Sequence, residues 1–155
     1  NRMINARADP AMAKPAFRIP MQKRRCLLPA DVFYEWQAVP GLRRKQPWAV
    51  AMADREPFAL GGLWDYWRPA DGGEGIVTCT VLTTEPNGLL APIHDRMPVI
   101  VHQSAYGAWL DPQTPVTAVM GLVQPYPADE MRAWPVGFEV NDPKMDDEDI
   151  LKPQA

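Results

Sequence analysis

Hydrophobic and polar positions alternate along several short runs of the chain, and these runs are rich in β-branched and aromatic residues. Because successive side chains of a strand point to opposite faces of a sheet, alternation with this composition predicts β-strands. Glycine, proline, aspartate and asparagine separate the runs and favour turns. The sequence predicts strands at residues 2–9, 24–30, 32–39, 46–52, 58–67, 76–84, 97–101 and 134–142.

The connections between these strands carry their own signals. The segment DGGEG, between the strands at 58–67 and 76–84, is typical of a hairpin loop. Pro29 is expected to break the second strand from the third, because proline cannot donate a ladder hydrogen bond.

Helical signals are few and short. Asp9 and Pro10 favour a helix start, Ser104 is a candidate N-cap for a helix ending at Leu110, and residues 115–123 fit either a helix or a buried strand. The acidic residues 143–155 are expected to form a solvated tail. Together the pattern predicts an α+β fold that is predominantly β, in one domain over residues 1–155 without a linker.

The composition limits the class of protein. The 18 prolines among 155 residues are scattered, which favours short strands and many fixed turns. No apolar run has the roughly 18 residues of a membrane span, and no secretory signal is evident. Cys26 and Cys79 are too far apart for a disulfide framework, and two histidines are too few for a metal site. We therefore expect a cytoplasmic protein without a metal or cofactor.

Charge is distributed unevenly along the chain. The first 48 residues carry ten basic and three acidic side chains, a net charge of +7, whereas the whole chain has a net charge of −3. A basic third in an acidic protein indicates a localised anion-binding face, with phosphate as the obvious ligand. The alternative is that Arg24, Arg25, Arg43 and Arg44 are solvated strand ends.

Glu35 stands between Tyr34 and Trp36 in the segment DVFYEWQ. Alternation places Glu35 on the same face of its strand as Phe33, and the other two aromatic residues on the opposite face. Glu35 is therefore either a solvated strand residue or a partly buried acid whose pKa burial would raise. Trp36 could belong to the core or could stack on a nucleic-acid base, and Trp64 has the same two interpretations.

Three further polar residues have both a structural and a functional interpretation. His94, in IHDRMP, is either a loop histidine paired with Asp95 or a group for proton transfer near neutral pH. Asn5, in INARAD, is either a structural amide or a polar group of a site. Arg7 is either a surface cation or a phosphate ligand. No single residue decides between these interpretations.

The motifs NARA, FYEW and HDRMP, in that order, resemble those of the SOS-response-associated peptidase (SRAP) family of abasic-site processing proteins. The resemblance continues through KPAF, FALGGLWDYW, TCTVLTTEPNGLLAP and QPYP, so it spans nearly the whole chain. It implies a SRAP-like fold of mixed and antiparallel strands in a compact barrel-like core, with short peripheral helices. It also implies covalent capture of the aldehyde of an abasic site in single-stranded DNA by an amino-terminal cysteine, which closes a thiazolidine ring, with associated autopeptidase and lyase activity.

The resemblance assigns a role to each motif residue. Asn5 would orient the terminal amine, Glu35 would shuttle protons during imine formation, and His94 would assist proton transfer and reversal of the adduct. Arg7, Thr83 and Arg96 would contact DNA phosphates. We expect a monomer without a cofactor or membrane partner, which associates with the nucleoid when bound to DNA.

The family's reactive cysteine lies upstream of the NARA motif, outside the 155 residues. Cys26 and Cys79 cannot replace it, because a thiazolidine needs a free amine beside the thiol and their nitrogens are in peptide bonds. The chain by itself is therefore expected not to crosslink DNA. Two alternatives remain: a non-catalytic single-stranded DNA-binding module, and a general peptidase or hydrolase.

Overall fold

The computed structural model describes residues 4–11, 14–145 and 147–153. Most of the regular structure is in strands, with short α- and 3-10 helices, so the predicted α+β class with a predominance of β structure is confirmed. Contacts between residues divide the chain into two compact units. The first comprises Asn1–Pro29, Phe58–Glu85 and Pro98–Tyr126, and the second Ala30–Pro57, Pro86–Met97 and Pro127–Ala155.

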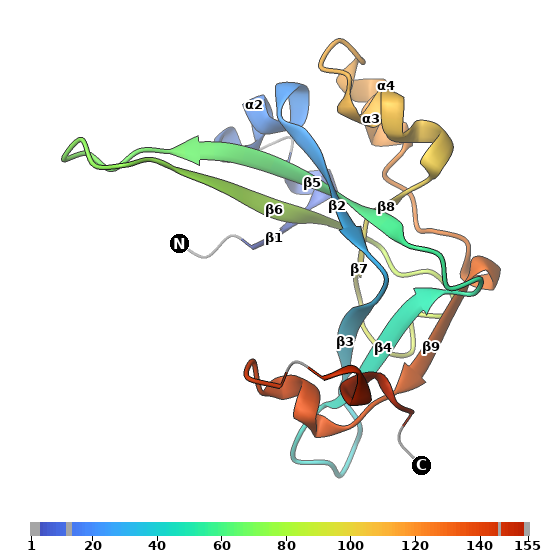
Figure 1. Ribbon diagram of the computed structural model, residues 1–155. Helices are drawn as coiled ribbons and strands as arrows, with labels where there is room; N and C mark the ends of the chain where they lie inside the picture. Colours follow the sequence, from blue (N-terminus) through green and yellow to red (C-terminus); the bar gives the residue numbers. More distant parts are fainter. Residues whose placement is uncertain (1–3, 12–13, 146, 154–155) are drawn as a thin grey trace. The chain divides into compact units, whose positions relative to one another are not determined.

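The first unit is built on a mixed sheet in the order β1-β6-β5-β2, with β7 paired to β6 and β8 paired to β5 (Figure 1). Strands β1 and β6 are parallel, whereas β5 and β6 form the predicted antiparallel hairpin. The strands are β1 (Asn5–Arg7), β2 (Arg25–Ala30), β5 (Phe58–Trp67), β6 (Ile76–Thr84), β7 (Met97–Pro98) and β8 (Ile100–Val101).

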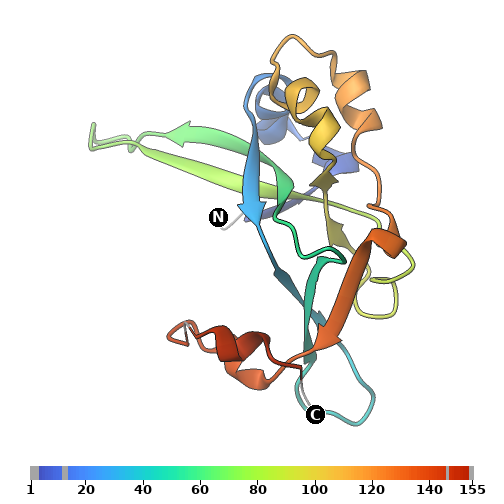
Figure 2. The same cartoon turned by 45° about the vertical axis from the view of Figure 1, so that its right-hand side comes forward.

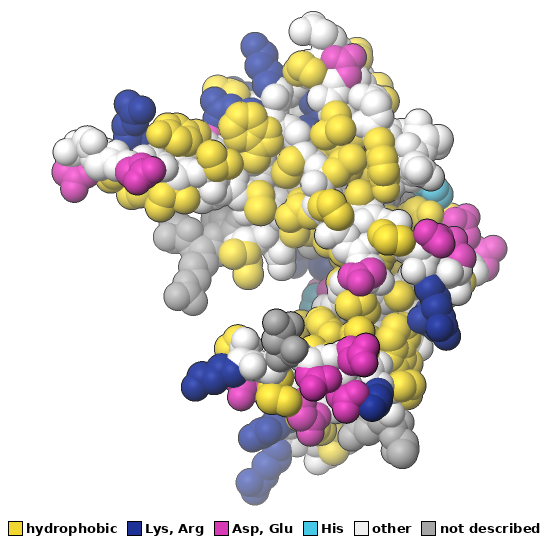
Figure 3. Space-filling view, in the orientation of Figure 1, with side chains coloured by type: hydrophobic (Ala, Val, Ile, Leu, Met, Phe, Trp, Pro, Cys, Tyr) yellow, Lys and Arg dark blue, Asp and Glu magenta, His cyan; other side chains and the backbone are white. Residues whose placement is uncertain are grey.

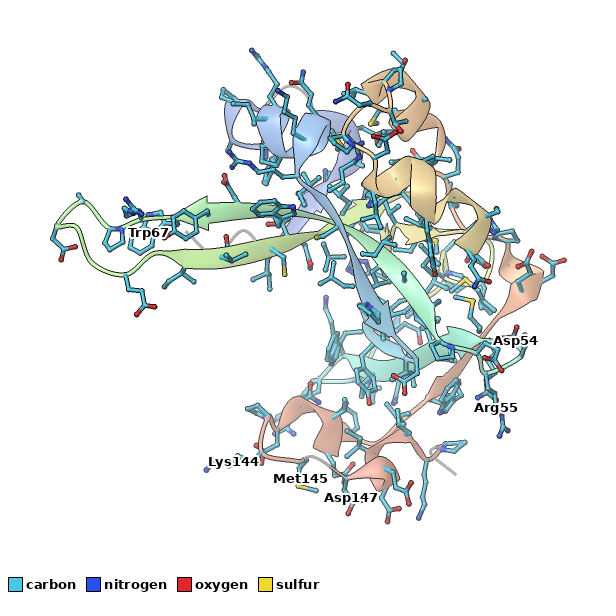
Figure 4. The ribbon with its side chains drawn as sticks, turned by 45° about the horizontal axis from the view of Figure 1, so that its top comes forward. Asp54, Arg55, Trp67, Lys144, Met145 and Asp147 are labelled. Carbon is cyan, nitrogen blue, oxygen red and sulfur yellow. The ribbon has the colours of Figure 1, made fainter. Side chains whose placement is uncertain are left out.

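The far end of the β5–β6 hairpin extends away from the helices of the first unit, and Trp67 lies near its tip (Figure 4). Hydrophobic side chains gather along this hairpin in the space-filling view (Figure 3). Its exposed large hydrophobic residues are Trp64, Tyr66, Trp67, Ile76 and Val77.

Short helices complete the first unit: α1 (Ala8–Ala11), α2 (Pro15–Lys23), η1 (Gln103–Ala105), α3 (Tyr106–Leu110) and α4 (Val116–Gly121). The helix predicted to open at Asp9 and Pro10 begins one residue earlier, and a second helix opens with Pro15 in its first turn. Ser104 does not cap α3, because it lies inside η1. The segment at 115–123 contains α4, so its ambiguity resolves in favour of a helix.

The core of the first unit surrounds the fully buried Trp109, whose indole Nε1 donates to the Cys26 carbonyl at 2.9 Å. Arg25 is also buried in this unit, with 5% of its surface exposed. Its guanidinium donates to the carbonyls of Trp109, Met21, Gln22 and Asp111. Because the last carbonyls of a helix have no partner within the helix, Arg25 satisfies the ends of α2 and α3 together.

The second unit holds an antiparallel sheet in the order β3-β4-β9. It comprises β3 (Phe33–Gln37), β4 (Gln46–Met52) and β9 (Met131–Pro135), with three 3-10 turns: η2 (Ala128–Glu130), η3 (Phe138–Asn141) and η4 (Glu148–Leu151). Figure 2 shows β3, β4 and β9 side by side. Pro29 does not end β2, which continues to Ala30, so the break with β3 falls at residues 31–32.

The last strand differs from the prediction at 134–142. The ladder with β4 runs from Met131 to Pro135, and the chain then turns into η3. The following acidic segment is exposed over much of its length, and Figure 4 labels Lys144, Met145 and Asp147 on it. The expectation of a wholly solvated tail is wrong for its end, because Trp134 Nε1 donates to the Leu151 carbonyl at 2.7 Å.

Among the residues that the structure describes, no helix is long and apolar enough to cross a membrane.

Candidate acid–base site and sheet face

Glu35 lies in the middle of β3, opposite Trp48 of β4. Phe33 and Gln37 share its face of the sheet by the two-residue period of the strand, and Tyr34 and Trp36 occupy the other face. Only 19% of the Glu35 side chain is exposed. Burial raises the pKa of Glu35, opposed by the nearby His94 and Lys45 and by a backbone hydrogen bond at Trp36. Of the two alternatives predicted for Glu35, the structure therefore shows the partly buried acid.

His94 follows a compact turn that Asn87 organises. The Asn87 Oδ1 accepts from the backbone amides of Leu89 and Leu90 at 3.1 and 3.0 Å, and the amide of His94 donates to the Leu90 carbonyl at 2.9 Å. The Leu90 side chain is fully buried, so it anchors the turn. This local structure brings His94 Nδ1 to 3.8 Å from the Glu35 Oε2.

The same ring nitrogen faces three other groups. The amide of Arg96 approaches His94 Nδ1 at 3.1 Å, the Arg96 carbonyl lies at 3.1 Å, and Asp95 Oδ1 at 3.3 Å. In a neutral ring Nδ1 accepts from the Arg96 amide, which leaves the proton on Nε2. In a charged ring the Nδ1 proton faces the Glu35 and Asp95 carboxylates and the Arg96 carbonyl. Nδ1 thus has one amide donor and three oxygen atoms around it.

Gln37 fastens the His94 turn to β3. Its Nε2 donates to the Pro92 carbonyl at 2.8 Å, and its Oε1 accepts from Trp48 Nε1 at 3.0 Å. Sequence reasoning missed this residue, as it missed Asn87. The sequence did contain a signal for Gln37, namely its position: a residue two positions after Glu35 on a strand lies on the same face.

The remaining predicted site residues belong to the first unit, except Arg96. Asn5 and Arg7 are exposed on β1, on either side of the buried Ala6. The parallel register sets Arg7 beside Thr83 and Asn5 beside Val81 of β6. Since Ala6 and its partner Leu82 face the core, Asn5, Arg7 and Thr83 share the opposite face of the sheet.

Two groups of predicted residues thus form within the units. Glu35, His94 and Arg96 come together in the second unit, where Arg96 is half-buried and contacts His94 through its backbone. Asn5, Arg7 and Thr83 come together in the first. Asn5 therefore belongs to the first unit, and Glu35 and His94 to the second. In the described part of the chain, no three histidine, cysteine, aspartate or glutamate side chains are grouped to hold a metal ion.

The structure thus combines a fold of mixed strands with a Glu35 carboxyl that lies beside His94. Residues 1–143 match the family model described as SOS response associated peptidase (SRAP), so the chain belongs to the SRAP family. A protein of Bacillus subtilis named "Abasic site processing protein YoqW" is 40% identical over 152 residues, covering 97% of this chain and 67% of its own length. The mouse "Abasic site processing protein HMCES" is 30% identical over 175 residues, covering 96% of this chain and 49% of its own.

Solved structures share the fold of this chain. A crystal structure of a protein from Bacteroides thetaiotaomicron superposes with a TM-score of 0.91 at 30% identity, covering 97% of this chain and 66% of that one. A protein from Bordetella bronchiseptica gives a TM-score of 0.77 at 35% identity, covering 86% of this chain and 65% of that one. The chain spans about two thirds of the length of these bacterial relatives.

Proposed function

We propose that this chain supplies the acid–base pair and part of the strand-binding surface of a protein that captures abasic sites in single-stranded DNA. The observation that carries the proposal is the partly buried Glu35 carboxyl, whose pKa is raised by burial and whose Oε2 lies 3.8 Å from His94 Nδ1. The names of the relatives supply the substrate class.

The proposed reaction joins an amino-terminal cysteine of the intact protein to the sugar aldehyde. The amine nitrogen adds to C1′, and the hydroxyl oxygen leaves as water when an acid protonates it. The thiol sulfur then adds to C1′ of the imine, and the ring nitrogen receives the proton that the thiol loses. One water is released, and no oxidant or metal is required.

Glu35 is the acid that fits the dehydration step. A carboxyl serves near neutral pH only if its pKa is raised, and partial burial has this effect on Glu35. After donating its proton, the carboxylate is stabilised by His94 and Lys45, which both act on it electrostatically. It can therefore take a proton back when the amine or thiol must lose one.

His94 is the partner that we assign to the return of protons. Its Nδ1 faces both Glu35 and the Arg96 carbonyl, so a protonated ring remains satisfied while the carboxyl is charged. We assign Arg7 and Thr83, which are paired across β1 and β6, to the phosphates of the bound strand. Asn5, on the same face, is assigned to the terminal amine.

The test uses the intact product of the natural gene and an oligonucleotide with one abasic site. A shifted band on a denaturing gel, stable in high salt, is the expected sign of covalent capture. Glu35→Gln keeps the size of the side chain but removes the acid, and should slow band formation by about 100-fold or more. Glu56→Gln, which changes an exposed carboxyl of the same unit, is the matched control and should react at the wild-type rate.

Two results would contradict the proposal. Equal rates for Glu35→Gln and Glu56→Gln would remove Glu35 from the reaction. The absence of a band with any protein, together with binding that weakens as salt rises, would favour the non-catalytic module. The exposed Arg7 beside Thr83 gives that second candidate its physical basis.

A further inference from the structure

A cavity in the second unit lies against β9. It has a volume of about 540 Å³, and its lining residues all belong to that unit. This volume is within the ~300–1,000 Å³ typical of small-molecule sites. Two of the lining residues, Arg132 and Trp134, lie on the Tyr34 face of the β3–β4–β9 sheet by the strand register. Glu35 points to the opposite face, so the cavity is separate from the acid–base pair.

Apolar residues form most of the wall of this cavity. They include Ala51 of β4, Trp134 of β9 and Leu151 of η4. Trp134 Nε1 donates to the Leu151 carbonyl at 2.7 Å, and Val136 forms an antiparallel bridge with Pro153. These contacts hold the segment that follows η3 against β9, so the wall is formed before any ligand arrives. An apolar group that enters the cavity leaves water, which favours its binding.

Three charged side chains also line the cavity: Asp31, Arg55 and Arg132. Within the described residues, none of the three has an ion-pair partner within 4.0 Å. The guanidinium carbon of Arg132 lies 4.7 Å from the centre of the Trp134 ring. The Arg132 Nε is buried without a hydrogen-bond partner among the described groups. Because buried polar groups are nearly always hydrogen-bonded, this guanidinium still has donors to offer to a ligand.

Arg55 stands at a backbone position that favours glycine. Its φ is 68°, in the left-handed region that other residues adopt at a cost. Arg55 belongs to the turn after β4 (Figure 4), where the Ala53 amide donates to the Glu130 carbonyl at 2.9 Å and the Glu56 amide to Asp54 Oδ1 at 3.0 Å. An arginine at such a position points to a use for its side chain, since strained conformations gather at ligand sites.

We propose that this cavity binds a small carboxylic acid, as its monoanion, with a flat apolar body. The carboxylate accepts from the guanidinium groups of Arg132 and Arg55, whose planar forks match its two oxygens. The apolar body contacts Trp134 and Leu151. Two cations and the Asp31 carboxylate leave the lining with a net charge of +1, which suits one negative charge better than two. The inference does not depend on the proposed function.

The first test compares naphthoate with naphthamide, which has the same rings but no charge, by isothermal titration calorimetry on the whole chain. Naphthoate should bind at least about tenfold more tightly, because its carboxylate makes charge-assisted hydrogen bonds. Arg132→Met should weaken naphthoate about tenfold, and Arg132→Lys, which keeps the charge but not the fork, should weaken it severalfold. Arg43→Ala, which changes an exposed arginine of the same unit outside the cavity, is the control and should bind as wild type. Equal affinity for naphthoate and naphthamide, or no binding of naphthoate in the millimolar range, would overturn the proposal.

The second test separates binding from folding at Arg55. Because glycine adopts a positive φ without steric cost, Arg55→Gly should leave Tm unchanged or raise it. The same substitution removes one guanidinium from the cavity and should weaken naphthoate about tenfold. Asp31→Asn should act in the opposite direction and tighten naphthoate severalfold, since it removes a negative charge from the lining. Wild-type affinity in Arg55→Gly, or weaker binding in Asp31→Asn, would exclude a carboxylate held in this way.

The third test locates the ligand by nuclear magnetic resonance. The indole N–H signal of Trp134, assigned by its loss in Trp134→Phe, should shift as naphthoate is added, because the Trp134 ring lines the cavity. The indole N–H signal of Trp109, which is fully buried in the first unit, should stay in place. Naphthoate binding that leaves the Trp134 signal unmoved would place the ligand elsewhere and refute the assignment.

Discussion

Gly61 of β5 packs directly against the indole of Trp109, and this close approach yields a quantitative prediction. A Cβ added at Gly61 would lie 2.8 Å from Trp109 Cζ2, 3.1 Å from Cη2 and 3.2 Å from Val101 Cγ2. Carbon atoms in contact normally lie about 3.5–4.0 Å apart. The substitution Gly61→Ala therefore requires the indole or the strand to move.

Neither neighbour moves freely. Trp109 is fully buried, and its Nε1 is tied to the Cys26 carbonyl at 2.9 Å, while Val101 is 2% exposed on β8. Overpacking a tight core typically costs about 1–3 kcal/mol. For a chain of this length each kcal/mol shifts Tm by about 2–4 °C. Gly61→Ala should thus lower Tm by about 2–12 °C.

The assay is thermal unfolding followed by circular dichroism, with Gly107→Ala as the control. Gly107 lies within α3, and a Cβ there meets no atom within 4 Å, so alanine should be neutral or stabilise by up to about 1 kcal/mol. Combining Gly61→Ala with Trp109→Phe should recover part of the loss that the two changes cause separately, because the smaller ring leaves room for the methyl group. A Tm for Gly61→Ala equal to that of wild type, or strict additivity in the double variant, would refute this account of the core.

Three further predictions concern charge and tethering. Burial raises the pKa of Glu35, so the folded chain keeps the carboxyl proton to a higher pH than the unfolded chain. This proton's contribution to the free energy of unfolding is complete below the unfolded pKa of about 4.3, and it is lost as pH rises through the folded pKa. Glu35→Gln should therefore make the free energy of unfolding less dependent on pH above about 4, as measured by urea unfolding at several pH values. The same pH dependence in Glu35→Gln and wild type would contradict this. Arg25→Met should cost about 3–5 kcal/mol in urea unfolding, because four carbonyls lose their buried donor, whereas a loss below about 1 kcal/mol would show that water replaces it. Gln37→Leu frees the turn that carries His94. Its effect on the rate of abasic-site capture, expressed as a free energy, should therefore exceed its effect on the free energy of unfolding. An unchanged rate would show that the turn keeps its place without Gln37.

The strands were the most predictable part of the structure. The ranges Gln46–Met52, Phe58–Trp67 and Ile76–Thr84 coincide with the predicted ones, because each carries its own alternation and is bounded by turn residues. The last strand was misplaced because residues 134–142 contain aromatic and branched residues that suit a strand. Only the ladder with β4 fixes its bounds at Met131–Pro135, and no local signal reports a partner strand.

The candidate site was likewise predictable from the sequence only in part. The face of Glu35 follows from the strand period, whereas its raised pKa was only one of two alternatives that the sequence left open. The structure attributes that pKa to burial in the folded unit, and its sheet partner Trp48 comes from another strand. The strand period places Gln37 on the face of Glu35, but it does not reveal the partner of Gln37, because that hydrogen bond joins segments separate in sequence. The role of Asn87 depends on the turn already formed.

The sequence by itself determined the strand content, the partition of each strand into two faces, and the three motifs that resemble the SRAP family. The strands and their faces are properties of neighbouring residues, and the period of two and local turn chemistry are sufficient to set them. Only the tertiary structure decided that His94 lies beside Glu35, that Arg25 donates to the carbonyls at the end of α3, and that Asn141 fixes the indole of Trp36. The physical reason is that each of these contacts joins residues distant in the chain, and their distance is set by how the sheets and turns pack rather than by any local preference.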